Sequence, residues 1–378
     1  MKPVEVSLYV GRGVAVPAPA EVTRAFRSAE ITQGEQSPSG FQITFQASRS
    51  PSALDFDVFE SPWLLPYNRI IVSISVDGES YVLMDGLITR RDFTPPNGRD
   101  PATLTVTGDD VSAAMDLEQL SIPWPLLPDF LIVEAILAKY LVYGLAPLAL
   151  PTAISESNAP DEIACQQLGT DRSFIQQLAA RYGYIFQVDP GPVAGTNIAY
   201  WGPPVRVGMP NATLNVETLL SRNVASLSFS YDATAPTTVV GEVQDAEGLD
   251  EPVPIAALFS LRLPPMASEP AILANVPYVR SELFLQSQMD PIQALAEAQG
   301  TVDRSTDKVL TARGELNVLR YGKPLVCPGL VALRGAGYAH DGLYYVDSVT
   351  HHLSTESFTQ SFTLAREGLG STLPVVPG

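Results

Sequence analysis

Histidine, cysteine and carboxylate side chains are the groups in this sequence that could bind a metal or move a proton. The three histidines are His340, His351 and His352, and an adjacent pair in a strand would point to opposite faces. Cys165 and Cys327 lack the C-x-x-C spacing of metal and redox sites. We therefore expect no metal site, no cofactor and no catalytic residue, and we expect both cysteines to be reduced and buried.

Carboxylates are the most numerous ionisable groups, with 41 acidic residues in the chain. Some pair of them must lie at the separation that glycosidases use, yet no spacing selects one pair. The acidic run 245–251 (DAEGLDE) lacks the ordered ligand alternation of a calcium loop. The sequence contains no Walker loop, G-x-G-x-x-G, H-E-x-x-H or G-x-S-x-G motif. We therefore predict that the chain is not an enzyme.

The charge balance bears on possible partners. The chain has 23 basic residues and a formal net charge of −18, which argues against sequence-specific nucleic acid binding and against binding by phosphate neutralisation. Its 33 prolines and 27 glycines, with only 17% charged residues, indicate short strands, many turns and large surfaces buried against partners. This composition favours a component of an assembly.

The two most apolar parts of the chain do not predict a leader or a membrane span. Met1–Val10 reads as a strand, because no basic start leads into a long apolar core, so we expect the protein to be made in a cytoplasm. Leu126–Leu150 contains Asp129, Glu134 and Lys139, which leaves too little uncharged length to cross a bilayer. We predict a buried helix there and no stable membrane insertion.

The first part of the chain consists of short runs rich in β-branched and aromatic residues, separated by Gly, Pro, Asn or Asp. These runs are VEVSLYV (4–10), FQITFQ (41–46), RIIVSISV (69–76), YVLMDGLI (81–88) and ATLTVT (102–107). Asp77-Gly78 stands between two of the runs and predicts a two-residue hairpin turn.

Helical patterns follow these strands. Asp109 and Asp110 are candidate N-caps for a helix over VSAAMDLEQL. Beyond an extended, proline-rich segment, Asp129 would cap a second helix that runs to Tyr143 and stops at Gly144.

Two further helices are predicted. One begins at Asp171, ends at Gly183 and is followed by a strand over Tyr184–Val188. Its apolar residues recur at helical spacing and are expected to face the core; they are Phe174, Ile175, Leu178 and Tyr182. The other has Asp290 as its N-cap and a proline in its first turn, and it ends at Gly300.

Strands resume in the second part of the chain, over 213–216, 224–231, 237–243 and within 309–366, whereas Gln244–Pro277 shows little periodicity. This order predicts an α+β, mainly β fold with two small β-barrel domains that carry helical and loop insertions. The predicted units are a first β-barrel domain (1–110), a helical and loop insertion (111–205), a second β-barrel domain (206–244 and 308–368), a second insertion (245–307) and a C-terminal tail (369–378).

The block Gly322–Ser371 holds the most specific pattern in the sequence. It opens with Gly-Lys-Pro, continues through Pro-Gly, a Gly-Ala-Gly turn and DGLYYVDSVTHHL, and closes with SFTQSFTLAR. The last strand places Phe358, Gln360, Phe362 and Leu364 on one face. In these elements the block resembles the end of the phage late control gene D proteins, the hub family of contractile tails.

A second segment supports this resemblance. Thr170–Val188 (TDRSFIQQLAARYGYIFQV) is similar to the helix and strand found in such hubs and in the hub part of VgrG spike proteins, and the two segments keep the family's order. VgrG continues into a neck and a needle, whereas this chain stops soon after the second β domain. The resemblance therefore implies a separate trimeric spike protein as a partner.

The resemblance implies a homotrimer whose two barrels per chain form a pseudo-six-fold ring. Such a ring would join the six-fold tail tube, or its tube initiator, to a three-fold spike, contact the baseplate wedge proteins and form part of the channel for DNA or cargo delivery. The expected location is a virion tail baseplate, or an extracellular or cytoplasmic contractile injection particle, assembled in the bacterial host cytoplasm. From the net charge of −18 we expect an acidic channel lining.

Two other classes of protein remain open as alternatives. A tail-associated cell-wall hydrolase would need a cleft that contains carboxylates with shifted pKa values. A carbohydrate-binding β module would expose stacked aromatic residues, whereas Trp63, Trp124 and Trp201 each stand alone near prolines.

Overall fold

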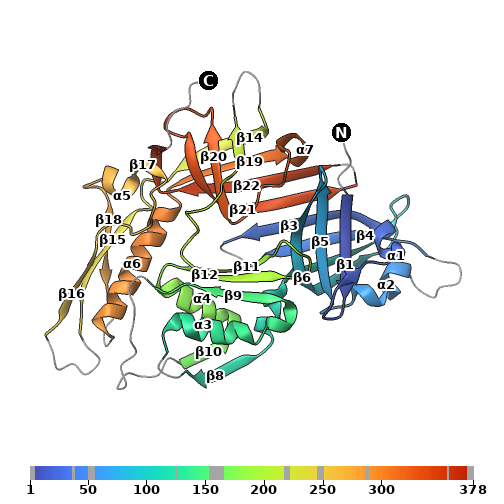
Figure 1. The fold of residues 1–378 in the computed structure, drawn as a ribbon, viewed down its shortest axis with the longest axis horizontal. Helices are drawn as coiled ribbons and strands as arrows, with labels where there is room; N and C mark the ends of the chain where they lie inside the picture. The colour runs from blue at the N-terminus through green and yellow to red at the C-terminus, as the bar shows by residue number, and fades with distance from the viewer. Residues whose placement is uncertain are drawn as a thin grey trace.

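The computed structural model describes residues 5–35, 39–49, 56–124, 127–152, 166–216, 222–244, 251–285, 289–355 and 357–372. Strands predominate over helices in these segments (Figure 1), as the expected α+β, mainly β class requires. Within the same segments, no helix combines the length and the apolar character that crossing a bilayer would need.

Thirteen strands form one large sheet. They are β1 (Glu5–Gly11), β2 (Val16–Pro17), β3 (Phe26–Gly34), β4 (Gly40–Ala47), β5 (Arg69–Val76), β6 (Glu79–Thr94), β7 (Ala102–Asp110), β13 (Asn211–Asn215), β14 (Val224–Tyr231), β19 (Leu310–Asn317), β20 (Gly329–Arg334), β21 (Gly342–Ser354) and β22 (Phe358–Arg366). Their order is β14-β19-β22-β21-β3-β4-β7-β6-β5-β1-β2, with β20 also on β21 and β13 on β20. This path is open, and no closed barrel occurs among the described strands, so the expectation of two barrels is corrected.

The sheet consists of two half-sheets with the same arrangement. The N-terminal half-sheet has the order β3-β4-β7-β6-β5-β1 and the C-terminal half-sheet has the order β14-β19-β22-β21-β20-β13, so strands with the same rank along the chain occupy the same place. Both have an irregularity in the first strand of this order, at 26/28 and at 224/226, and another in the fourth, at 88/90 and at 346/348. The half-sheets differ in one respect, because β1 is antiparallel to β5 whereas β13 is parallel to β20.

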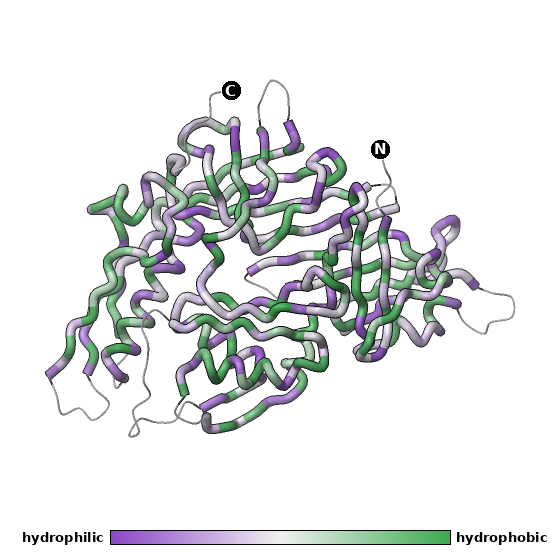
Figure 2. Tube along the Cα trace, viewed as in Figure 1, coloured by the Kyte–Doolittle hydropathy of each residue, from purple (hydrophilic) through white to green (hydrophobic). Residues whose placement is uncertain are grey.

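Alternation of side chains explains why these segments form strands with one buried face. In β4, Ile43 and Phe45 are fully buried while Gln42 and Thr44 lie on the other face, and Figure 2 shows this alternation of hydropathy along the strands. The buried residues of both half-sheets belong to one continuous core. The predicted turn is confirmed, since Asp77 and Gly78 have φ values of 52° and 91°.

The first lobe lies between β7 and β13 along the chain (Figure 1). Its core is separate from that of the large sheet and includes Ala296 of the second lobe. The first lobe contains the 3₁₀ helices η2 (Val111–Asp116) and η3 (Leu141–Tyr143), the helices α3 (Asp129–Ala138) and α4 (Asp171–Arg181), and the strands β8 (Gln119–Pro123), β9 (Leu145–Ala149), β10 (Gln166–Thr170), β11 (Ile185–Pro190) and β12 (Asn197–Gly202). The predicted helix at Asp171 is confirmed, with Thr170 as its N-cap and Gly183 at φ 65° beyond its end.

Three helix predictions in this lobe are corrected. Asp110 caps only the 3₁₀ helix η2, by accepting a hydrogen bond from the Ser112 amide, and the chain then turns into β8. Asp129 is the first residue of α3 and not its cap, because its carboxylate pairs with Arg181 at 3.0 Å. Leu126–Leu150 is not one buried helix, since α3 ends at Ala138 and the segment closes with strand β9, which pairs with β12.

The second lobe lies between β14 and β19 and contains β15 (Thr237–Val243), β16 (Val253–Ala257), β17 (Ala267–Pro270), β18 (Arg280–Phe284), α5 (Ala271–Ala274) and α6 (Pro291–Asp307). β15, which falls within the predicted second barrel, pairs instead with β16 and β18. β23 (Gly368–Ser371) pairs with β17. The remaining helices pack at the large sheet and are α1 (Ala20–Ala25), α2 (Asp57–Glu60), η1 (Pro62–Leu64) and α7 (Val318–Tyr321).

A contact between two glycines joins the lobes. Asp290 caps α6 as predicted, but the helix continues through Gly300 to Asp307. Gly300 lies against the end of α4, where a Cβ atom would come within 2.6 Å of the Gly183 nitrogen and the Tyr182 carbonyl carbon. Glycine is therefore required at this position inside the helix for close packing, and it does not end the helix.

We predict that Gly300→Ala lowers the free energy of unfolding by about 2 kcal/mol, because the new methyl group meets backbone atoms that cannot rotate away. Helix propensity alone predicts the opposite sign, a gain of about 1 kcal/mol. Urea unfolding followed by circular dichroism distinguishes the two results. Leu295→Ala, at a partly exposed position of the same helix, is the control and should change stability less.

Candidate functional site

The three histidines, which were predicted to be structural, have different surroundings. His351 is buried and His352 lies on the opposite, solvent-facing side of β21, as the alternation predicted. His340 contacts the Phe229 ring, with 4.4 Å between ring centroids. Among the described residues, no group of three or more His, Cys, Asp or Glu side chains could hold a metal ion.

Of the two cysteines, only Cys327 lies among the residues that the structure describes. Cys327 is a free, buried thiol, as predicted, and its burial raises its pKa well above the ordinary value, so it stays protonated. Cys165 and residues 245–250 of the acidic run lie outside the described residues.

The two half-sheets meet where β21 pairs with β3, from Ser348 opposite Gly34 to Ser354 opposite Ser28. A buried chain of hydrogen bonds crosses this seam. Gln33 donates to the Leu83 carbonyl at 2.9 Å, and its own carbonyl oxygen lies 3.1 Å from His351 Nε2. The seam therefore joins the N-terminal half-sheet to a histidine of the signature block, which is the block Gly322–Ser371 whose pattern resembles the hub family.

Gln360 fixes the tautomer of this histidine. Its amide nitrogen lies 3.0 Å from His351 Nδ1 and 3.0 Å from the Leu325 carbonyl, while its oxygen accepts from the Leu325 amide at 2.8 Å. An amide nitrogen only donates, so His351 Nδ1 accepts and Nε2 donates to Gln33. Burial, with a smaller effect of His352, lowers the pKa of His351 to about 3. The imidazole is therefore neutral and serves as a connector.

We predict that Gln360→Leu lowers the free energy of unfolding by about 2 to 4 kcal/mol, because it leaves His351 Nδ1 and both backbone groups of Leu325 buried without partners. Chemical unfolding of the full chain measures this loss. Thr359→Val, which changes the neighbouring residue on the solvent-facing side, is the matched control and should cost less than about 1 kcal/mol. Equal losses in the two variants would contradict the assigned role of Gln360.

A charged cluster lies beside the seam. Lys308, which follows α6, is 2.5 Å from Asp347 Oδ1 and 3.5 Å from Glu35 Oε2. Burial raises the pKa of Glu35 to about 7, with Lys308 opposing the rise and the carboxylates of Asp307 and Asp347 adding to it. Glu35 therefore exchanges a proton near neutral pH while it bridges β3, α6 and β21.

We predict that stability falls as the pH rises from about 4.5 to 7 through the contribution of Glu35. The folded chain holds a proton on Glu35 up to about pH 7, whereas the unfolded chain releases it near the ordinary value of 4.5. Glu35→Gln removes this contribution, so the difference in unfolding free energy between the variant and the natural chain should change with pH.

Measurements at pH 5 and pH 7.5 by urea unfolding test this prediction. Other groups whose protonation differs between the folded and the unfolded chain in this interval, such as His351 and Asp189, are common to both proteins and cancel in the difference. Glu21→Gln, on the exposed side of α1, is the control. A difference for Glu35→Gln that does not vary with pH would refute the assignment.

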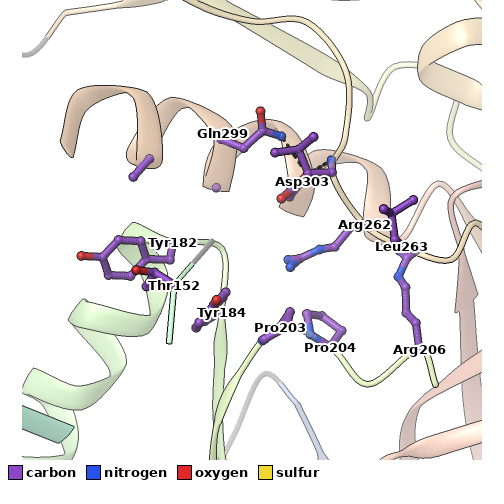
Figure 3. Close-up of a pocket in the computed structure, with 13 residues that line it drawn as sticks. Thr152, Tyr182, Tyr184, Pro203, Pro204, Arg206, Arg262, Leu263, Gln299 and Asp303 are labelled. Atoms are coloured by element: carbon purple, nitrogen blue, oxygen red, sulfur yellow. Dashed lines mark hydrogen bonds between the residues drawn. The ribbon is translucent and has the colours of Figure 1, made fainter. Parts of the chain in front are cut away.

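The pocket drawn in Figure 3 lies between the two lobes, beside the segment 203–206 that leads to β13. It encloses about 200 Å³ and is lined by Thr152, Tyr182, Tyr184, Pro203, Pro204, Arg206, Leu261, Arg262, Leu263, Ala296, Gln299, Gly300 and Asp303. Tyr182 and Tyr184 come from the first lobe, and Gln299 and Asp303 project from α6.

The charged groups at this pocket are used in joining parts of the chain. Arg262 pairs with Asp307 at 3.1 Å and donates to the Gly183 carbonyl of the first lobe. Arg206 lies between Asp307 at 2.9 Å and Glu367 at 3.1 Å. These arginines therefore connect both lobes to the end of β22, which accounts for their burial as charged residues.

The remaining carboxylate of the lining, Asp303, is also engaged. Its Oδ1 atom accepts from Ser260 Oγ and the Leu261 amide at 2.8 Å each and from Gln299 Nε2 at 3.0 Å. The lining contains no serine, cysteine or histidine, so it holds no Ser-His or Cys-His pair.

The solvent-facing side of the large sheet is rich in hydroxyl groups and continues across the seam. This hydroxyl face consists of Ser226, Ser228, Arg313, Glu315, Ser361, Thr363, Thr350, His352, Glu30, Thr32, Gln42, Thr44, Thr105 and Thr107. The charged residues on this side are Glu30, Arg313 and Glu315, together with Arg90 and Asp92, which pair with Thr107 and Thr105. The hydroxyl face is therefore nearly neutral, in a chain whose net charge is −18.

The helices next to the large sheet leave the hydroxyl face uncovered. The residues that α1, α2 and α7 bury, such as Val22, Val58 and Val318, belong to the core on the other side. A hollow of about 360 Å³ lies on the hydroxyl face, over β14, β19, β21 and β22. This side of the sheet is thus free to meet solvent or a partner.

The signature block and the structure agree on which residues matter at the seam. His351 and Gln360, both quoted in the block, are brought together, and Phe358, Gln360, Phe362 and Leu364 share the buried side of β22. Gln33 was missed, because 26–34 was not predicted as a strand. The signal that could have found it is its place two residues after Ile31, since alternation puts both side chains on the same face of a strand.

Comparison with known proteins gives the fold a context. No protein-family model matches the sequence, and no curated protein matches it. The structure is similar to a tail protein from Neisseria meningitidis MC58, with a TM-score of 0.65 and 16% identity over 98% of both chains. It is also similar to a 43 kDa tail protein of prophage MuSo2 from Shewanella oneidensis, with a TM-score of 0.64 and 14% identity over 96% of this chain and 98% of that one.

A third similar structure comes from a secretion machine. It is a component of the Escherichia coli type VI secretion system described as similar to T4 bacteriophage tail proteins, with a TM-score of 0.53 and 13% identity over 93% of this chain and 77% of that one. The chain therefore has the fold of phage tail proteins, as the resemblance predicted, while the late control gene D family itself stays a prediction.

Proposed function

We propose that a chain with this tail-protein fold serves as the structural hub of a contractile-tail baseplate. Three copies would form a ring that joins the six-fold tail tube, or its initiator, to a separate three-fold spike protein. The observation that carries the proposal is the repeated strand order of the two half-sheets. Three copies would present six similar half-sheets, which is what an adapter between the two symmetries needs.

The domain division is part of this proposal. The N-terminal half-sheet falls within 1–110, and all six strands of the C-terminal half-sheet fall within the second predicted unit, 206–244 and 308–368. The lobes correspond to the insertions 111–205 and 245–307, apart from β15. Residues 369–371 of the proposed tail belong to β23 and hold the end of the chain against β17.

The hydroxyl face is proposed as the lining of the channel for DNA or cargo. An acidic lining was expected from net charge, but this uncovered face presents serine and threonine hydroxyl groups and few charges. On such a wall the few arginines are balanced by acids, so it offers little attraction to retain phosphate groups and little repulsion to exclude them. The proposal thus replaces an acidic lining with a nearly neutral one.

The proposed location is a virion tail baseplate or a contractile injection particle, assembled in the cytoplasm of a bacterial host. Baseplate wedge proteins would contact the outside of the ring. Contacts between copies would have to be permanent, and permanent interfaces bury roughly 2,000 Å² or more. The role is structural, and no step of it requires a catalytic residue.

We predict that the purified chain has a native mass of three times its chain mass of 40.6 kDa, alone or in the presence of its tube and spike proteins. Native mass spectrometry and sedimentation velocity measure this mass, and affinity capture of the co-expressed proteins identifies the partners. A chain that stays monomeric with both candidate partners present would refute the hub. Release of sugar from peptidoglycan by the same preparation would favour the hydrolase.

A further inference from the structure

The seam inside the chain shows how one half-sheet can join another. β21 has two parts, since Gly342–Val346 pairs with β20 and Ser348–Ser354 pairs with β3. An irregularity at 346/348 separates the two parts. The second part therefore extends beyond β20 and offers its edge to the first strand of the other half-sheet.

β6 is built in the same way in the N-terminal half-sheet, but its second part has no partner on one side. Glu79–Leu87 pairs with β5, and an irregularity at 88/90 precedes Arg90–Thr94. These last residues pair with β7 on one side only. No other strand of the described chain pairs with their second side, which is the side that β3 fills in β21.

β14 is the matching strand without a partner. It occupies in the C-terminal half-sheet the place that β3 occupies in the N-terminal one, and it pairs with β19 alone among the described strands. Its sequence, VASLSFSY, contains no charged residue and no proline, either of which would protect a free edge. A free strand of this kind is suited to pairing with another chain.

We propose that residues 90–94 of β6 in one copy pair antiparallel with β14 of the next copy, repeating the seam between β21 and β3. The occupant of each free edge is thus a second copy of this chain. The inference rests on the proposed function, because it names the contact by which the hub copies would form their ring. Each contact is head to tail, so repetition generates a ring if the rotation closes.

The shared irregularities set the register of this pairing. They place Arg90 where Ser348 stands in the seam and Ser226 where Ser28 stands. Transferring the pairs of the seam then puts Arg90 opposite Asp232, Asp92 opposite Ser230, and Phe93 opposite Phe229.

The side chains brought together in this register are complementary. Arg90 and Asp232 carry opposite charges and are exposed in the single chain, where Arg90 also pairs with Asp92 at 2.8 Å. Phe93 and Phe229 are partly buried hydrophobic residues at the edge of the same core, so the join would extend that core as an aromatic pair. Asp92 and Ser230 lie on the polar side, so the hydroxyl face would also continue from one copy to the next.

Disulfide cross-linking between two single variants tests the pairing. Asp92→Cys and Ser230→Cys are each made in the full chain with Cys165→Ser, and the two proteins are mixed and oxidised. Residues directly opposite in antiparallel strands have Cα atoms about 4.5 to 5.5 Å apart, which a disulfide spans. We expect a covalent dimer from the mixture in high yield and little from either variant alone.

Asp92→Cys mixed with Phe229→Cys is the matched control, because that residue is one position out of register and on the other side of the sheet. A trimeric chain that forms no 92–230 bond, or that links 92 to 229 equally well, would overturn this pairing and leave the hub proposal standing. In the Asp92→Cys/Ser230→Cys double variant, 92–230 linkage that gives open chains of increasing length and no closed covalent trimer would support the pairing and refute the closed hub ring.

Charge reversal gives a second test that does not depend on a disulfide. Arg90→Glu places two acids opposite each other and should weaken association several-fold, as measured by sedimentation at low salt. Asp232→Arg in the same chain should restore it. Restoration supports the register, whereas a double variant weaker than both single variants contradicts it. Circular dichroism of each variant identifies any that fails to fold, and for such a variant the cross-link decides.

Discussion

The pairing of β21 with β3 is the contact on which the rest of the structure depends. It makes one open sheet from two half-sheets, and it merges their cores into one. The chain of hydrogen bonds from Leu83 through Gln33, His351 and Gln360 to Leu325 satisfies polar groups that the merger buries. A buried polar network of this kind rigidifies a join when all its members have partners.

The lobes are attached to this sheet by different interactions. Close backbone packing joins them to each other, through Gly183 and Gly300, while Arg206 and Arg262 fix both to the end of β22. Ion pairs buried in this way set geometry more than they add stability. The pocket in Figure 3 is the space left between these attachments.

The sequence predicted local structure well where one interaction decides it. The Asp77-Gly78 turn, the helix after Thr170 and the cap at Asp290 follow from backbone conformation and hydrogen bonding within a few residues. The predictions from sequence failed where contacts between residues far apart in the chain determine the structure. Gly300 was read as a helix end because its neighbour Gly183 is far away in sequence, and the charge of Asp129 was assigned to a cap when Arg181 neutralises it. The open sheet was hidden for the same reason, since β3 and β21 are separated by most of the chain.

The direction of one strand has a consequence for the two rims of such an assembly. β1 and β13 hold the same place in their half-sheets but run in opposite senses relative to their neighbours. The first strand of one half-sheet therefore begins at the edge of the sheet where the first strand of the other half-sheet ends. In a ring of three copies the six half-sheets would be alike, but at each rim of the ring half-sheets whose first strand begins there would alternate with half-sheets whose first strand ends there. A protein that binds one rim would therefore meet three-fold symmetry on a ring that is otherwise nearly six-fold.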